Sequence, residues 1–363
     1  MAVLDWKKYN KKIFNLFIGI LLSLILFNVF TDPYNIFDMP KIKYFNAIKS
    51  DAGRNQRVTK IVNLKLDKTP LNSVFLGSSR VDATISEKYY NQLTNLNTKN
   101  LGMNALSHSE TIKVANYVVL VHPEIKKIYV GLDFFRFLER NKDEKREVVI
   151  PKTTKLTIAE INPLILSFNT TLSSINTLKA NLFPKKKKKE YNPKPEFIRI
   201  INQYAKNYKN AELSIEEIKK LKQLQIDMNK KGIEVIFYTN PTHAIDMALI
   251  DELKVLSVFN EWKIQLAEYF DYIDFDFIND LTVENVDKNT KYFKESSHGT
   301  AKLGEIIVDY LVLKNNSYAK QINKNNVRSF SILNNKQIKN WEVKNPEWNE
   351  IIKEAIEKQN EKI

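Results

Sequence analysis

Hydrophobic positions in this chain form one long run near its start and short, spaced groups after it. The run covers residues 13–30, and its only polar members are a serine and two asparagines, the second of them Asn28. About 18 to 20 apolar residues are enough to cross the hydrocarbon core of a bilayer. The pattern therefore predicts a transmembrane helix at residues 13–31, preceded by a basic flank at residues 1–12.

The charges around this run predict its orientation. Four lysines and one acidic residue, Asp5, precede it. The positive-inside rule then places the N-terminus in the cytoplasm and the rest of the chain beyond the inner (cytoplasmic) membrane, in the periplasm or outside the cell. A cleaved signal peptide is the alternative, but residues 28–33 offer no small-x-small cleavage site. A buried core helix is a second alternative, and a lysine-rich flank is unusual for one.

After a juxtamembrane stretch at residues 32–54, short apolar segments alternate with segments of helical periodicity. The expected strands are 74–76, 128–132, 233–238 and 273–277, and the expected helices are 57–66, 111–120, 215–231, 249–269 and 301–313. Such alternation favours a parallel sheet covered by helices on both faces. We therefore expect an α/β domain with three αβα layers at residues 55–313.

Two segments depart from this alternation. Residues 150–212 contain five prolines and the run Lys185 to Lys189, and we expect an inserted, partly helical subdomain or lid there. The lysine run is typical of a solvated loop, with contact to an acidic polymer or a lipid surface as the alternative. Residues 314–363 are polar and rich in asparagine and lysine, which predicts a polar C-terminal extension with a final helix from Glu347.

Composition excludes several kinds of chemistry. The chain has 363 residues, 43% of them hydrophobic, which is enough for a substantial core. It contains no cysteine, so disulfides, thiolate metal ligands and a cysteine nucleophile are excluded. No histidine pair has metal-ligand spacing on one element, and no glycine-rich nucleotide motif occurs, so we expect neither a metal nor another cofactor. His108 and His122 are interpreted as structural.

The net charge of +14 bears on partners. The basic residues are mostly lysines, they are scattered, and no nucleic-acid motif accompanies them, so we expect no nucleic-acid partner. Anionic lipid head groups or an acidic polymer account for the charge as well. A genome whose codons favour lysine and asparagine is the alternative explanation.

Candidate chemistry lies in two distant stretches. Ser79 follows the apolar segment 74–76, and His298 comes just before the last helical segment. Ligands of open α/β sheets bind beyond the carboxyl ends of the strands, so both residues are expected at one sheet edge. There they would form an activated serine nucleophile. The alternatives are a serine that caps the next helix and a histidine without a partner.

Four short blocks occur in the order found in the SGNH (GDSL-type) hydrolase superfamily, which the chain resembles over about residues 73–313. The blocks are Gly77-Ser78-Ser79, Gly102 within Asn100–Asn104, Gly131-Leu132-Asp133, and Glu295-Ser296-Ser297-His298. The resemblance is strongest to membrane-anchored proteins of cell-envelope O-acylation, such as the alginate acetylation proteins and the protein that D-alanylates lipoteichoic acid. It implies a flavodoxin-like αβα fold and serine esterase or O-acyltransferase activity.

The resemblance also implies residue roles. Ser79 would be the nucleophile, and His298 would take its proton and return it to the leaving group. The backbone N–H groups of Ser79 and Gly102 would bind the oxyanion.

Two residues depart from the family pattern. Glu295 stands where the family has aspartate, so it either orients the imidazole or leaves a serine–histidine dyad. Asp133 stands where an asparagine usually donates to the oxyanion, and an ionised carboxylate cannot donate. Asp133 would therefore be protonated, turned away, or a ligand for a substrate hydroxyl, and Asn104 is the candidate for the missing donor. Asn240 and His243 follow a strand at the same edge and are candidates for substrate binding, with a loop histidine of no special role as the alternative.

These observations predict a membrane-anchored acyltransferase or esterase that acts on acyl groups, acetyl above all, of a cell-envelope polysaccharide through a Ser79 acyl-enzyme. Its expected partners are a membrane-bound O-acyltransferase, as acyl donor, and an acidic envelope polysaccharide. Glu295 and Asp133 suggest one alternative, a non-catalytic polysaccharide-binding or assembly factor. A tethered structural protein without this chemistry is the other.

Overall fold

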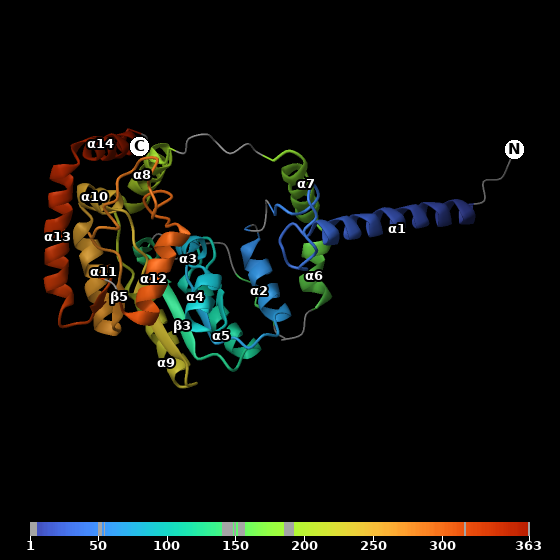
Figure 1. The fold of residues 1–363 in the computed structure, drawn as a ribbon, viewed down its shortest axis with the longest axis horizontal. Helices are drawn as coiled ribbons and strands as arrows, with labels where there is room; N and C mark the ends of the chain where they lie inside the picture. Colours follow the sequence, from blue (N-terminus) through green and yellow to red (C-terminus); the bar gives the residue numbers. More distant parts are fainter. Residues whose placement is uncertain are drawn as a thin grey trace. The chain divides into compact units, whose positions relative to one another are not determined.

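The structure, a computed structural model, describes residues 6–49, 53, 55–139, 148, 150–151, 157–184, 192–315 and 317–361. The chain divides into two compact units (Figure 1). The first unit combines Met1–Lys68 with Val149–Lys189, and the second combines Thr69–Val148 with Glu190–Ile363.

The second unit is built on a sheet in the order β2-β1-β3-β4-β5-β6. Its strands are β1 (Ser73–Leu76), β2 (Thr98–Asn100), β3 (Lys127–Leu132), β4 (Glu234–Thr239), β5 (Tyr272–Asp274) and β6 (Lys320–Ile322). The first five strands run parallel, while β6 pairs with β5 in the antiparallel direction. In this order β1 lies between β2 and β3, so the chain direction across the sheet reverses there, and ligands of such sheets bind at this reversal.

Helices cover the sheet because its central strands are apolar on both faces. All four residues of β1 and the last five of β3 are buried, which requires cover on each side. The helices are α3 (Ser79–Thr84), α4 (Glu87–Thr94), α5 (His108–Val121), α8 (Lys194–Tyr208), α9 (Ile215–Asn229), α10 (Ala244–Glu252), α11 (Leu256–Tyr269), α12 (Ala301–Leu313), α13 (Val327–Lys344) and α14 (Pro346–Asn360), with a short 3₁₀ helix at Phe134–Phe137. Helix α9 packs against α5 and α11, and helix α12 packs against α3 and α4. The expected α/β architecture with a mostly parallel sheet is confirmed.

The first unit consists of helices around the N-terminal segment. They are α1 (Trp6–Thr31), α2 (Gln56–Leu66), α6 (Ile158–Ile165) and α7 (Phe168–Leu182). Both α6 and α7 pack on α1, and α2 packs on α6. A small apolar cluster of Tyr34, Ile36, Val62 and Leu164 joins these segments.

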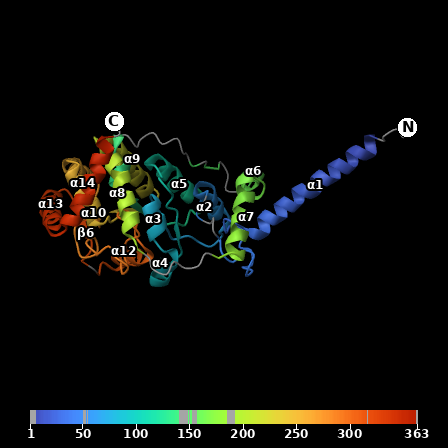
Figure 2. The ribbon, with the colours of Figure 1, turned by 90° about the horizontal axis from the view of Figure 1, so that it is seen from above.

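Helix α1 is the one helix in the described part of the chain that is long and apolar enough to cross a membrane, judged by length and composition. In Figure 2 most of α1 extends away from α6 and α7 of the same unit, and only Asn28 and Thr31 of its side chains are buried. The alternative of a buried core helix therefore does not fit the structure.

The domain boundaries differ from those expected. Residues 150–212 do not form one insertion, because α6 and α7 belong to the first unit while α8 belongs to the second. The apolar face of α8, centred on Ile201, packs against α10 and α14. The expected C-terminal extension is also part of the second unit, since β6 completes the sheet and α13 packs on α11. The lysine run 185–189 lies outside the described residues.

Candidate active site

A tight turn presents Ser79 at the carboxyl end of β1. Gly77 links the strand to α3 with φ +149°, where a Cβ atom would lie 2.5 Å from Val81 Cγ2 and 2.9 Å from the Gly131 carbonyl oxygen. Only glycine fits a position that combines this backbone angle with such close neighbours. The turn therefore fixes where α3 begins, and Ser79 is its first residue.

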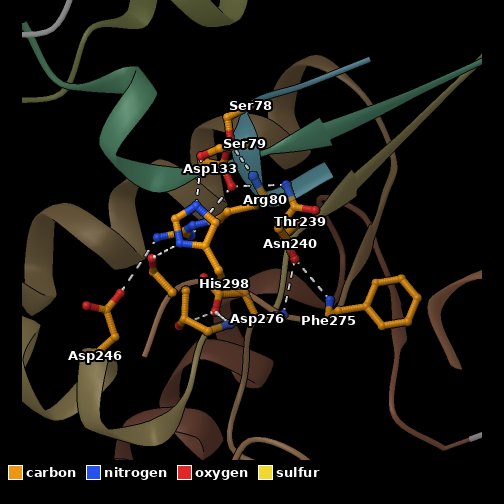
Figure 3. Close-up of polar contacts among 12 residues, drawn as sticks. Ser78, Ser79, Arg80, Asp133, Thr239, Asn240, Asp246, Phe275, Asp276 and His298 are labelled. Atoms are coloured by element: carbon orange, nitrogen blue, oxygen red, sulfur yellow. Dashed lines mark hydrogen bonds and ion pairs between the residues drawn. The ribbon is translucent and has the colours of Figure 1, made fainter. Parts of the chain in front are cut away.

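Ser78, and not Ser79, caps the helix. The Ser78 hydroxyl oxygen accepts the Arg80 backbone N–H at 3.1 Å. The Ser79 hydroxyl instead faces the imidazole of His298, with Oγ 2.8 Å from Nε2 (Figure 3). The interpretation of Ser79 as a simple cap is therefore not supported.

His298 is held by the carboxylate three residues before it. Its Nδ1 is hydrogen-bonded to Glu295 Oε1. The other oxygen of Glu295 accepts the Ser297 N–H at 2.7 Å, and the Ser297 hydroxyl lies 3.0 Å from His298 Nδ1. The Glu295 side chain is 6% exposed and that of His298 is 27% exposed, so the carboxylate is enclosed while the imidazole reaches solvent. The geometry corresponds to a Ser–His–Glu triad and not to a dyad.

The charge on Glu295 decides which imidazole nitrogen carries the proton. Burial raises the pKa of Glu295, but its hydrogen bonds to His298 and to the Ser297 N–H outweigh burial and hold that pKa below its usual value. An ionised Glu295 can only accept, so Nδ1 of His298 donates to it. The lone pair of Nε2 is then directed at the Ser79 hydroxyl, as a general base requires.

The loop that carries His298 is packed directly on α3. The backbone N–H groups of Tyr292 and Phe293 both donate to Glu284 Oε1 at 2.8 Å. A Cβ on Gly299 would lie 3.0 Å from Thr84 Oγ1, and one on Gly304 only 1.8 Å from the Thr84 carbonyl oxygen. The two glycines thus let the loop and α12 approach the helix that begins with Ser79.

A buried charged cluster lies behind the nucleophile. Arg80, 2% exposed, is 3.5 Å from Asp133 Oδ1 and 3.9 Å from Asp246 Oδ2 (Figure 3). It also donates to the Tyr204 hydroxyl at 3.4 Å. Burial alone would lower the pKa of Arg80, but Tyr204, the two aspartates and Tyr208 raise it well above the usual value. The guanidinium of Arg80, the residue after Ser79, therefore keeps its positive charge beside the two aspartates.

The sequence did not identify Arg80, Tyr204 or Asp246 as members of this cluster. The available signal was an arginine immediately after the candidate nucleophile, together with an aspartate inside the otherwise apolar segment of α10. Burial raises the pKa of Asp246 to about 7, although Arg80 opposes this shift.

Asp133 takes an acceptor role. Its Oδ1 accepts Asn240 Nδ2–H at 3.0 Å in addition to facing Arg80. Asp133 is 2% exposed and Asn240 3%, so both lie beneath the surface behind Ser79. Of the roles considered from the sequence, a carboxylate turned toward internal partners fits best, and contact of either residue with a substrate stays a prediction.

The expected oxyanion donor Gly102 is already engaged. Its backbone N–H donates to Asn100 Oδ1 at 2.9 Å, and a Cβ there would lie 2.6 Å from the Asp82 backbone nitrogen. This glycine therefore allows the loop to pack on α3, and its N–H, which was expected to bind the oxyanion, has the Asn100 side chain as its acceptor. Asn104 lies exposed two residues further on, and its role as a donor stays a prediction.

His243 is a structural residue and not part of a substrate site. It is 1% exposed, Nε2–H donates to the Glu284 carbonyl oxygen at 2.8 Å, and Nδ1 accepts the Ile245 N–H at 3.2 Å as the cap of α10. Burial lowers its pKa to about 4, so the ring is neutral near pH 7. The sequence-based hypothesis of substrate contact by His243 is therefore wrong, because both ring nitrogens serve the backbone.

The other two histidines have structural partners. His108 Nδ1 pairs with Glu217 Oε2 at 2.9 Å in the interior, and His122 follows the last turn of α5 beside Glu124. Across the residues that the structure describes, no group of three or more histidine, aspartate or glutamate side chains is arranged to hold a metal ion.

Comparison of the chain with protein-family models, with curated proteins and with solved structures finds no match.

Proposed function

We propose that the chain is a membrane-anchored serine esterase or O-acyltransferase of SGNH type, which moves an acyl group to or from a hydroxyl of a cell-envelope polysaccharide. The observation that carries the proposal is the 2.8 Å contact between Ser79 Oγ and His298 Nε2, with Glu295 on the far side of the imidazole. The strand order 2-1-3-4-5, which is flavodoxin-like, and the position of Ser79 after β1 support it.

The reaction follows from these contacts. Ser79 Oγ attacks the acyl carbonyl carbon while its proton moves to His298 Nε2, and ionised Glu295 stabilises the imidazolium that forms. His298 then gives this proton to the departing alcohol oxygen, which leaves the acyl group as an ester on Ser79. Water or an acceptor hydroxyl then attacks the ester carbonyl while its own proton moves to Nε2. The bond to Ser79 Oγ breaks, and Nε2 returns the proton to Oγ, which restores the serine.

The developing oxyanion needs donors near Ser79. The Ser79 N–H is the first of α3, so the helix itself provides no acceptor for it. It is therefore the first donor in the proposal, and Asn104 is kept as the candidate for the second.

Location and partners complete the proposal. Helix α1 would anchor the chain, and the lysine-rich flank favours a cytoplasmic N-terminus with the second unit in the periplasm or outside the cell. Acetyl is the first acyl group to test, a membrane-bound O-acyltransferase is the partner expected to deliver it, and the basic net charge suits an acidic polysaccharide.

Hydrolysis of p-nitrophenyl acetate by the full-length protein in detergent tests the chemistry. We expect turnover that falls at least about 10³-fold in Ser79→Ala, since the nucleophile is lost. Ser86→Ala is the matched control, because Ser86 caps α4 and has no part in the reaction. Equal turnover by Ser79→Ala and the unchanged chain would contradict the proposal.

A second candidate function is supported by one observation. The Gly102 N–H donates to Asn100, and Asp133 replaces a donor with an acceptor, so the donors usual for an oxyanion are depleted. A non-catalytic protein that binds envelope polysaccharide would tolerate this. Binding of an acidic polysaccharide together with a complete lack of ester hydrolysis would favour this candidate over the first.

A further inference from the structure

Helix α7 carries its apolar side chains on the outside. Among them, Phe168 is 84% exposed, Leu172 42%, Ile175 37% and Leu182 48%. Their spacing of four, three and seven residues places them on one face of the helix. This face is therefore largely apolar, and no described part of the first unit covers it.

The inward face of α7 is polar. Its buried residues are Thr170, Ser173, Ser174, Thr177 and Asn181. A surface helix of a water-soluble protein has the opposite arrangement, with apolar residues inside and polar residues outside. Exposure of the apolar face to water would carry a free-energy cost, so the surroundings of α7 are expected to be apolar.

Small polar residues on the inward face suit close packing against α1, as in helix pairs within membranes. The amide of Asn28 on α1 donates to Thr171 Oγ1 at 3.1 Å and to the Ile165 carbonyl oxygen at 3.0 Å. At the other end of α7, the Asn181 side chain pairs with both backbone groups of Ile48 at 2.9 Å. Both ends of α7 are thus hydrogen-bonded to the chain between Asn28 and Ile48, which includes the end of α1.

The position of Asn28 gives the depth of α7. It lies two residues before the end of the apolar run 13–30, which is about 3 Å at the rise of an α-helix. The connection between α6 and α7 is therefore attached to α1 at the level where the membrane-spanning run ends. Leu22, Leu26 and Phe30 of α1 are themselves 53–54% exposed, so α1 presents apolar side chains up to the level at which α7 is attached.

We infer that α7 lies at the boundary between acyl chains and head groups of the leaflet where α1 ends, with its apolar face in contact with lipid. Exposed Lys179 shares this face, and a lysine there extends its ammonium group to the head groups while its methylene chain stays among the lipids. The part of the first unit that packs on α1 would then rest on the membrane surface. The inference is independent of the chemistry at Ser79.

The absence of cysteine makes a direct test straightforward. Single-cysteine variants Leu172→Cys and Ile175→Cys of the full chain are labelled with an environment-sensitive fluorophore and placed in phosphatidylcholine–phosphatidylglycerol vesicles. Leu16→Cys on α1 is the membrane control, and Gln223→Cys on α9 is the aqueous control. Quenching by nitroxide-labelled lipids is compared with quenching by iodide.

We expect labels at 172 and 175 to be quenched by nitroxide lipids at least half as strongly as the label at 16, and several-fold less by iodide than the label at 223. Iodide quenching equal to that at 223, without lipid quenching, would overturn the inference. Protection from both quenchers would also overturn it, because protein and not lipid would then cover the face. Ester hydrolysis measured on the same samples reports separately on Ser79.

Discussion

Ser78 satisfies the first turn of α3 and so leaves the hydroxyl of Ser79 to His298, 219 residues further along the chain. Two adjacent serines thus have different tasks, one in the backbone and one in the candidate site. The turn at Gly77 causes this difference, because it makes Ser78 the N-cap and Ser79 the first residue of α3.

Exchanging each serine for alanine separates these tasks. Ser78→Ala removes a helix cap, so we expect a loss of about 1 kcal/mol in the free energy of unfolding with most of the esterase activity kept. Ser79→Ala should leave unfolding nearly unchanged and abolish activity. Urea denaturation followed by tryptophan fluorescence, with p-nitrophenyl acetate turnover on the same samples, distinguishes the two. The reverse assignment of effects would show that Ser79 is the cap.

Glu295 is expected to act through the imidazole. In Glu295→Gln an amide replaces the carboxylate that accepts from Nδ1, and the preferred tautomer then no longer leaves Nε2 free as a base. We expect kcat to fall by about 10²- to 10⁴-fold with little change in KM. Glu295→Asp keeps the charge and should recover part of this loss. A Glu295→Gln variant as active as the unchanged chain would indicate a dyad.

Gly77 tests the packing of the nucleophile turn. Gly77→Ala combines a positive φ with a Cβ 2.5 Å from Val81 Cγ2, and we expect a loss of about 3 kcal/mol or more in unfolding free energy. Gly232→Ala is the matched control, since φ there is +72° and no heavy atom lies within 4 Å of the added Cβ. Its expected cost is about 1 kcal/mol. Equal costs at both positions, from urea denaturation, would show that close packing at Gly77 contributes nothing.

The raised pKa of Asp246 predicts that the stability of the fold depends on pH. Its pKa in the folded chain is about 7, above the usual 3.8, so between these values the folded state binds this proton more tightly than the unfolded state. Stability should therefore be greatest below pH 4 as far as Asp246 is concerned and fall as the pH rises to 7, by up to about 4 kcal/mol. Asp246→Asn should flatten this slope in urea denaturation, whereas Glu261→Gln, exposed on α11, should leave it unchanged. A slope retained in Asp246→Asn would contradict the assignment.

The sequence was sufficient for features that depend on local pattern. The strand before Ser79 and the loop before the expected helix 301–313 could be identified from short-range periodicity. Because ligands of parallel sheets bind beyond the carboxyl ends of the strands, Ser79 and His298 could then be expected at the same edge. Glu295 was a candidate because the SGNH pattern that the chain resembles has an acidic residue three positions before its histidine.

Features that depend on tertiary packing were beyond the sequence. The neutral, enclosed state of His243 depends on the loop at Glu284, whose backbone carbonyl accepts from its ring. The assignment of α7 to the N-terminal unit depends on Asn28, which looked in the sequence like an interruption of an apolar run. In each case a polar group finds its partner far along the chain.

Covalent labelling of the full-length protein by a fluorophosphonate, followed by peptide mapping, tests the central claim most directly. The account predicts a single phosphonylated site at Ser79, with labelling slowed at least about 10²-fold in His298→Ala because the general base is lost, and none in Ser79→Ala. Labelling that maps to another serine, or that proceeds equally fast without His298, would contradict the account.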